Sequence, residues 1–174
     1  IKKIIEGGHN IGNHTMHHKN GFKTGIQKYV NEVLQASEYI PSKLFRPPYG
    51  KCNIFQNLKL RKLGYKIIQW DVIAYDWDKT RTPHDVLSII EKYVRNGSII
   101  VLHDSVKASD RTLPILSTLI ISLKSRGFEI KTIISEAVSN AIIHGYHFDA
   151  SKDVYLKAAI YEDYIEIIVK DFGV

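Results

Sequence analysis

Apolar and polar residues alternate along the first 128 residues in a pattern that predicts short strands, each followed by an amphipathic helix. Apolar residues recur at helical spacing in four segments, and the segments before them are short, apolar and rich in β-branched residues. Four helices are predicted. The first begins near Thr24, the second covers Asn53 to Leu63, the third begins at the Thr82-Pro83 cap, and the fourth covers Leu113 to Lys124. The predicted strands are GHNIGNHT, KLFRPP, YKIIQWDVI and SIIVLHD.

Four strand-then-helix units at this spacing favour an α/β fold with a parallel sheet or barrel, because parallel strands need crossover connections. In such folds the chemistry gathers where strands end. The polar residues that follow the predicted strands are His14, Arg46 to Tyr49, Asp71 to Trp77, and His103-Asp104. The pattern therefore predicts one active-site rim.

The pattern changes after Gly127. FEIKTI predicts a strand up to about Ile133, and SEAVSNAIIHG predicts a helix from Ser135 to Gly145. DVYLKAAI and YIEIIVKD then alternate as the two strands of an antiparallel hairpin. This ending does not continue the strand-then-helix order, which predicts a boundary near residue 128.

Charge divides the chain at the same place. Residues 1–128 hold 20 lysines and arginines against 10 aspartates and glutamates, and residues 129–174 hold 4 against 8. An apolar content of 44% with 24% charged residues indicates a globular protein. Basic and aromatic residues are not interleaved, which disfavours a nucleic-acid partner. No apolar run is long enough to span a membrane, and the single cysteine, Cys52, excludes an internal disulfide.

The candidate chemistry of the first segment is metal-assisted hydrolysis. His14 and His18 stand four residues apart and are a candidate metal pair, which would need a carboxylate as a third ligand. Arg46 could hold a carboxylate, the Pro-Pro-Tyr-Gly turn could offer an amide to an oxyanion, and His103 is placed like a general acid. Taken singly, each also fits a structural role, as a solvated histidine pair, a plain turn or a strand-end histidine.

Four motifs in order, GHNIGNHTMHH, FRPPYG, WDVIAYDW and IIVLHD, resemble those of the polysaccharide deacetylases, carbohydrate esterase family 4. The resemblance implies a distorted (β/α) barrel that removes acetyl groups from chitin-like or peptidoglycan sugars. It also implies an acetylated polysaccharide as substrate and a place outside the cell or in its wall.

The same resemblance implies a role for each matching residue. His14 and His18 would hold a divalent metal, most simply zinc, Arg46 would orient the catalytic base, and Asp76 would tune His103, the acid. The Tyr49 backbone would line the oxyanion site, and Trp77 and Leu102 would wall the pocket for the acetyl methyl group.

Two departures from the family pattern lower the expected activity. The family's first motif, Thr-Phe-Asp-Asp-Gly, supplies the base and the third metal ligand, and this chain starts after the place where it should stand. Ile73 also stands where many members have an aspartate. We therefore expect an incomplete barrel, weak metal binding and little or no activity from the chain as given, whose opening at Ile1 predicts a truncated or processed start.

The C-terminal segment has a second resemblance, to the GHKL ATPase superfamily and, within it, to anti-sigma factors of the sporulation type. EAVSNAIIHGY is similar to their N-box, and DFGV is similar to the start of their adenine-binding box. By that resemblance Glu136 would be the base, Asn140 the Mg²⁺ ligand, and Asp171 and Gly173 part of the adenine site. The boxes that follow in that superfamily are missing, so we expect no measurable affinity for Mg-ATP.

The sequence thus predicts two parts, a deacetylase-like domain over residues 1–128 and a partial anti-sigma-like segment over 129–174. The deacetylase hypothesis is favoured, because it has four motifs. The alternative is an ATP-binding, cytoplasmic serine kinase that acts on sporulation transcription, with a sigma factor as its partner. Because the two functions belong to different compartments, we interpret the chain as a composite rather than a working fusion.

Overall fold

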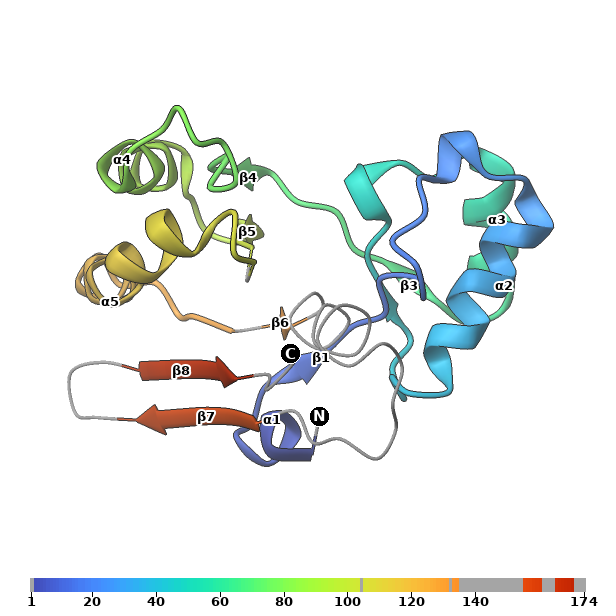
Figure 1. Cartoon of the computed structure of the whole chain (residues 1–174), viewed down its shortest axis with the longest axis horizontal. Helices are drawn as coiled ribbons and strands as arrows, with labels where there is room; N and C mark the ends of the chain where they lie inside the picture. Colours follow the sequence, from blue (N-terminus) through green and yellow to red (C-terminus); the bar gives the residue numbers. More distant parts are fainter. Residues whose placement is uncertain (1, 104, 132, 135–154, 161–164, 171–174) are drawn as a thin grey trace. The chain divides into compact units, whose positions relative to one another are not determined.

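The computed structural model describes residues 2–103, 105–131, 133–134, 155–160 and 165–170. They fall into two compact units (Figure 1). The first comprises the described residues of Ile1–Gln69 with strand β6 (Ile133–Ile134), and the second comprises those of Trp70–Thr132 with strands β7 (Tyr155–Ile160) and β8 (Ile165–Lys170). The boundary near residue 128 separates two family resemblances and stays a prediction.

The first unit follows the predicted order of strand and helix. Its strands are β1 (Asn10–Ile11), β2 (Leu44–Phe45) and β3 (Lys66–Ile67), and its longer helices are α2 (Ile26–Ser37) and α3 (Ile54–Lys62). It also contains a short helix, α1 (Lys2–Glu6), and two 3₁₀ turns, η1 (Gly21–Lys23) and η2 (Pro48–Gly50). The turn predicted at Pro-Pro-Tyr-Gly is thus confirmed as η2.

Parallel pairing joins the strands of this unit. β1 pairs with β6 and β2 pairs with β3, both in parallel. A parallel bridge between Asn13 and Phe45 links the residues after β1 to β2. The resulting order, β6-β1-β2-β3, confirms the predicted α/β class with parallel strands. The ends of β1 and β2 therefore lie side by side, which brings the segments after them together.

The core of the first unit is largely aromatic. Buried side chains from α2, β2, α3 and β3's flank form one cluster, which consists of Tyr29, Val30, Val33, Phe45, Leu60 and Tyr65. Helix α2 buries part of its predicted face, but Ile26 and Leu34 are 37% and 42% exposed and Glu32 is buried. A carboxylate inside a helix's buried face needs hydrogen-bond donors, and these are described with the candidate site below.

Helix α3 is tied to turn η1 by one buried side chain. The Gln56 amide donates to the carbonyls of Gly21 and Thr24, each over 2.8 Å. Its oxygen accepts from Asn53 N–H, and Asn53 in turn caps the helix, so the two residues form a capping box. The helix predicted over Asn53 to Leu63 is confirmed within one residue.

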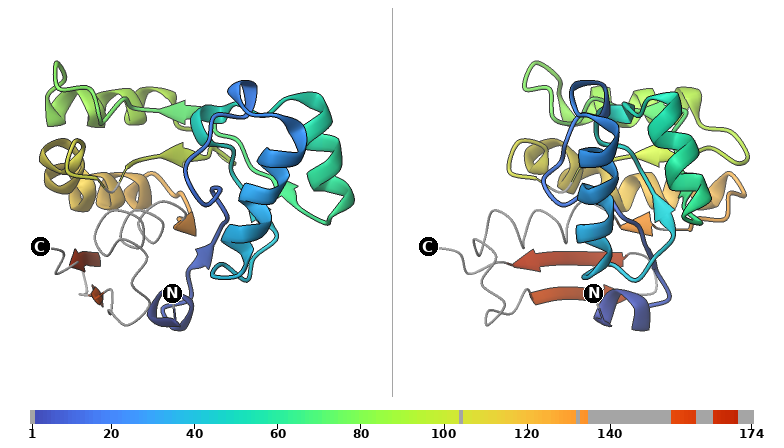
Figure 2. Two further views of the ribbon diagram at one scale, coloured as in Figure 1. Left: turned by 45° about the vertical axis from the view of Figure 1, so that its right-hand side comes forward. Right: turned by 90° about the vertical axis from the view of Figure 1, so that its right-hand side faces the viewer.

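The second unit consists of two parallel strands and two long helices. β4 (Val72–Ile73) pairs with β5 (Ile100–Val101), and α4 (Pro83–Tyr93) lies beside α5 (Ser109–Ser125) (Figures 1 and 2). The predicted cap of α4 is confirmed, because Thr82 and Asp85 form a capping box ahead of Pro83. Seven buried residues make its core: Val72, Ala74, Val86, Ile90, Ile115, Leu119 and Leu123.

Two predicted elements differ from the structure. YKIIQWDVI is not one strand but two, because β3 ends at Ile67 in the first unit and β4 begins at Val72 in the second. Helix α5 begins at Ser109, four residues before the predicted Leu113, and it includes Pro114 within its second turn. At this position proline has no N–H to donate to the Asp110 carbonyl, so α5 lacks one of its helical hydrogen bonds there.

The C-terminal hairpin is confirmed where the structure describes it. β7 and β8 pair antiparallel, with Leu156 opposite Val169. Of the strand predicted over FEIKTI, only the end is observed, because β6 begins at Ile133 and residues 128–131 are not in a strand. The helix predicted from Ser135 to Gly145 lies outside the described residues. Within the part of the chain that is described, we find no helix long and apolar enough to cross a membrane.

Asp71 fixes the start of β4 against the start of β5. Its carboxylate accepts from Ile99 N–H over 2.7 Å and from the Ser98 hydroxyl over 2.9 Å. It also lies 3.5 Å from the Arg95 guanidinium. The hydrogen bond from the Ile99 backbone, with that of Ser98, lowers the pKa of Asp71 below its ordinary value.

We expect D71N to destabilise the protein at neutral pH, and the difference to be smaller at a pH of about 3. A carboxyl whose pKa is lower in the folded protein stabilises it above the unfolded pKa, about 3.9, and this stabilisation is lost as the pH falls through the folded value. Urea unfolding of wild type and D71N at both pH values measures the difference. An equal difference at the two pH values would contradict this role of the carboxylate charge.

Candidate active site

The two candidate metal-binding histidines lie on the segment that follows β1. The imidazole of His14 is 4% exposed, and its Nδ1 lies 2.6 Å from the Arg46 carbonyl oxygen. A carbonyl can only accept, so Nδ1 of His14 is the donor and carries a proton. The His18 ring lies 5.0 Å from the His14 ring, centroid to centroid. The two rings therefore lie close together, and His14 is oriented by the Arg46 carbonyl.

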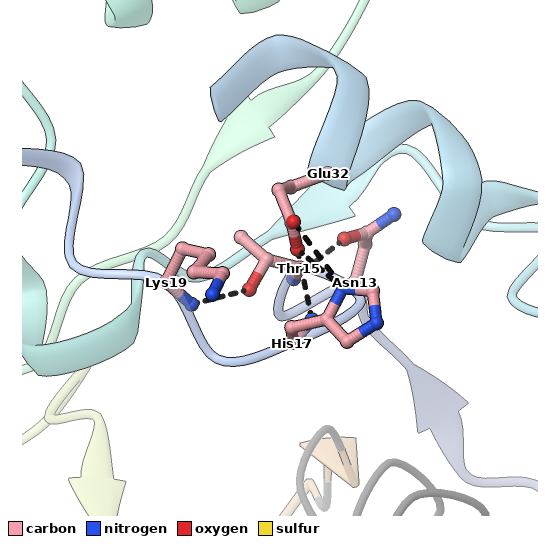
Figure 3. Close-up of polar contacts among 5 residues, drawn as sticks. All are labelled: Asn13, Thr15, His17, Lys19 and Glu32. Atoms are coloured by element: carbon pink, nitrogen blue, oxygen red, sulfur yellow. Dashed lines mark hydrogen bonds and ion pairs between the residues drawn. The ribbon is translucent and has the colours of Figure 1, made fainter. Parts of the chain in front are cut away.

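Helix α2 and the loop's own side chains hold the histidine segment in place (Figure 3). The Glu32 carboxylate accepts from the His17 backbone N–H over 2.9 Å and lies 3.1 Å from His17 Nδ1. Asn13 Oδ1 accepts from Thr15 N–H, and Thr15 Oγ1 accepts from Lys19 N–H. Buried Glu32 thus has its donors, and they come from the loop that carries the candidate ligands.

The backbone of this loop takes an unusual path. Thr15 and His18 have φ values of 64° and 50°, in the left-handed region that residues other than glycine rarely adopt. Such conformations cost about 1–3 kcal/mol each and persist where surrounding bonds fix them. The Asn13 amide supplies such bonds, because it donates to the Val33 carbonyl over 2.8 Å and to the Ser37 hydroxyl over 3.0 Å. The loop is therefore held in this shape by helix α2.

Arg46 and Tyr49 meet the histidines at the end of β2. The Arg46 carbonyl orients His14, and Arg46 N–H donates to the Asn13 carbonyl over 2.9 Å. The Tyr49 ring lies 4.7 Å from the His18 ring, and Tyr49 has a φ of 58° within η2. The structure thus brings four of the sequence-predicted residues together, His14, His18, Arg46 and Tyr49.

The donor set of this cluster fits part of a metal site. A histidine ligand commonly donates its other ring N–H to a carbonyl or carboxylate, as His14 does to Arg46. Over the described residues, no group of three or more His, Cys, Asp or Glu side chains is placed to hold a metal ion. His14 and His18 would therefore supply two of the three protein ligands that a catalytic zinc site commonly has.

The second unit holds a buried carboxylate bonded to a histidine. Asp76 is fully buried, and its Oδ1 lies 2.7 Å from His103 Nδ1 while Oδ2 accepts from His103 N–H over 2.6 Å. The His103 side chain itself is 23% exposed. A buried carboxylate that fixes a partly exposed imidazole is the arrangement of a general acid or base.

Trp77 and Leu102, the candidate pocket walls, have different surroundings. The Trp77 ring meets the His103 ring edge to face at 4.6 Å and is 37% exposed. Leu102 is half-buried and packs against the core of the second unit. The tryptophan thus stands beside the candidate acid, whereas Leu102 also contributes to the core.

Cys52 can be set aside as a nucleophile or metal ligand. Burial raises the pKa of its thiol to about 11, so the thiolate is scarce at neutral pH. The side chain packs against the first unit's core.

Sequence reasoning missed the residues that support the two sites. Glu32 and Asn13 support the histidine loop, and Thr112 donates to Asp76 over 2.8 Å. One signal was available, since Glu32 interrupts the apolar face of a predicted helix three residues after Tyr29. Thr112 gave no such signal, because it lay outside the predicted helix.

The candidate nucleotide-binding residues are not described. Glu136, Asn140, Asp171 and Gly173 all lie outside the described residues, and their roles stay predictions.

Comparisons with known proteins agree on one family for most of the chain. Residues 1–68 match the family model described as polysaccharide deacetylase. The chain is 32% identical over 140 residues to peptidoglycan-N-acetylglucosamine deacetylase PgdA of Listeria monocytogenes, covering 76% of this chain and 28% of that protein. It is 30% identical over 150 residues to chitooligosaccharide deacetylase of Sinorhizobium fredii, covering 76% of this chain and 69% of that protein.

Among solved structures, the Bc1960 peptidoglycan N-acetylglucosamine deacetylase matches with a TM-score of 0.68 at 27% identity, over 77% of this chain and 64% of that one. A separate, shorter match exists. Over 46 residues the chain is 52% identical to the anti-sigma F factor of Oceanobacillus iheyensis, which covers 26% of this chain and 32% of that protein. The chain thus spans about a quarter of the Listeria relative's length and about a third of the anti-sigma F factor's length.

Proposed function

Because this chain belongs to the polysaccharide deacetylase family, we propose that it serves the hydrolytic removal of acetyl groups from N-acetylated sugars of chitin-like or peptidoglycan polymers. The distorted (β/α) barrel fold of that family agrees with the parallel strand pairs described above. An acetylated polysaccharide substrate would place the activity at the cell wall.

The Asp76–His103 pair is the observation that carries the proposal. Amide hydrolysis needs a proton on the departing amine nitrogen, which is otherwise a poor leaving group. His103 Nδ1 is hydrogen-bonded to Asp76, so Nε2 is the nitrogen from which this residue would deliver the proton. The buried carboxylate stabilises the imidazolium form, and Trp77 shields one side of the ring.

In the first unit, His14 and His18 would hold a divalent metal, with zinc favoured by the two imidazole donors. When bound, such an ion supplies Lewis-acid activation of the acetyl carbonyl and of a water. The Arg46 carbonyl keeps His14 in the tautomer that presents Nε2 to a ligand. The Arg46 guanidinium would orient the catalytic base, and the Tyr49 backbone would serve the oxyanion, but we assign no general base among the described residues.

Release of acetate tests the proposed function. The purified protein is incubated with zinc and either an N-acetylated chito-oligosaccharide or acetylated peptidoglycan fragments, and acetate is quantified. H103A serves as the matched negative control, because it removes the proposed acid. Acetate release that depends on both zinc and His103 supports the proposal, and equal release by H103A contradicts it.

We expect H14A and H18A each to weaken zinc affinity by at least about tenfold, because each removes one of two imidazole ligands. Calorimetric titration of the protein with zinc measures this directly and needs no turnover. H84A is the matched control, since His84 is exposed on α4 in the other unit. Zinc affinities that are the same in H14A, H18A and H84A would exclude this pair as the site.

A second candidate function rests on the match to the anti-sigma F factor. Under it, Glu136 would activate a water, Asn140 would ligate Mg²⁺, and Asp171 and Gly173 would contact adenine. Its support is similarity over 46 residues, whereas the deacetylase proposal also has the contacts of His14, Asp76 and His103. Titration of the protein with Mg-ATP distinguishes the two.

A further inference from the structure

Two adjacent residues of helix α5 donate hydrogen bonds to Asp76. Thr112 Oγ1 donates to Asp76 Oδ2 over 2.8 Å, and Arg111 Nε donates to the Asp76 backbone carbonyl over 2.6 Å. Arg111 also donates to the Lys107 carbonyl, which ties its guanidinium to the segment just before the helix. Both residues are 8% exposed. We call this pair the Arg111–Thr112 clamp.

The clamp leaves the Asp76 carboxylate with donors on both oxygens. Oδ1 faces His103 Nδ1, and Oδ2 accepts from both His103 N–H and the Thr112 hydroxyl. At Oδ2 the His103 backbone N–H and the Thr112 hydroxyl donate from two different directions. Together these bonds restrict rotation of the carboxylate group, and its orientation determines where Oδ1 meets the imidazole.

The use that Thr112 makes of its hydroxyl supports a specific role. A threonine inside a helix commonly returns its hydroxyl bond to the carbonyl four residues earlier. The Thr112 hydroxyl has one proton and donates it to Asp76 instead. The hydroxyl thus donates its hydrogen bond to a carboxylate 36 residues away in the sequence.

We propose that the Arg111–Thr112 clamp positions His103 through Asp76, which makes Thr112 a positioning residue of the acid. The role of His103 in the reaction rests on the proposed function, but the coupling from Thr112 to His103 does not. Without the hydroxyl, the carboxylate has one neutralising donor fewer and its charge acts more strongly on the imidazolium.

The pKa of His103, measured by NMR titration of this chain with H103Q for assignment, tests the coupling. T112V keeps the shape of the side chain and removes the hydroxyl, and we expect the pKa of His103 to rise by about half a unit. T112S restores the hydroxyl and should restore the wild-type value. T118V is the matched control, because Thr118 is exposed on the same helix. Arg111 faces Asp76 in each of these variants, so its charge cannot produce a difference between them.

A second arm separates positioning from simple stability. In a D76N background, T112V should leave the pKa of His103 unchanged, because the path through the carboxylate is gone. If the protein releases acetate, kcat should fall about tenfold in T112V with KM little changed, which is typical of residues that orient a functional histidine. A His103 pKa in T112V that equals the T118V value or falls below it would overturn the proposal. If instead the pKa rises and no acetate is released, the proposed function fails and the coupling stands.

Discussion

D76N is expected to lower the pKa of His103 and, in any acetate release that the protein shows, to lower kcat by about 100-fold or more, the contribution typical of general acid catalysis. The fully buried carboxylate accepts three hydrogen bonds, two from His103 and one from Thr112. An asparagine in its place has one acceptor oxygen, so a donor of His103 loses its partner inside the protein. The imidazolium also loses the neighbouring negative charge. Both effects act on the group that would protonate the departing amine.

The measurement combines kinetics with NMR. We expect kcat to fall in acetate release and the pKa of His103 to fall as well, because the charged ring is no longer stabilised. D78N is the control, since Asp78 is two residues away, partly exposed, and bonded to Thr80 rather than to His103. The NMR readout does not depend on turnover. If D76N and D78N leave the same His103 pKa, the pair has no electrostatic role and the proposed acid is wrong.

Periodicity predicted the elements better than their ends or breaks. The helices near Thr24, Asn53 and Thr82 are observed, and the last two have the side-chain caps that define a start in sequence. The long strand over YKIIQWDVI was wrong, because a continuous apolar run does not reveal that the chain passes from one unit to another within it. Local pattern carries no information about such a tertiary event.

The candidate site could be predicted for the residues that follow strands and not for those that support them. His14, Arg46, Asp76 and His103 stand at strand ends, so the fold class itself points to them. Glu32 and Thr112 lie on helices, and their role depends on which loop packs against those helices. That contact is set by the tertiary fold. The position after a strand therefore predicts the candidate reactive residues. The residues that support them are found only in the structure.

The junction between β2 and the histidine loop explains why a core residue matters to the candidate metal pair. Phe45 is fully buried between the rings of Tyr29 and Tyr65, at centroid distances of 6.2 and 6.3 Å. It pairs with Asn13 on one side, and Arg46, whose carbonyl orients His14, comes directly after it. Loss of the Phe45 ring therefore acts on the core and on the position of the next residue together.

F45A is expected to destabilise the protein by about 3–5 kcal/mol, the usual cost of removing a fully buried phenylalanine ring. That is a large share of a typical domain's stability, about 5–15 kcal/mol. Urea unfolding followed by circular dichroism measures the change. F55A is the matched control, because Phe55 lies on α3 with 63% of its surface exposed and should change stability by less than about 0.5 kcal/mol. A similar small loss in both variants would show that the three edge-to-face aromatic rings do not form the core of the first unit, and the orientation of His14 by Arg46 would then need another support.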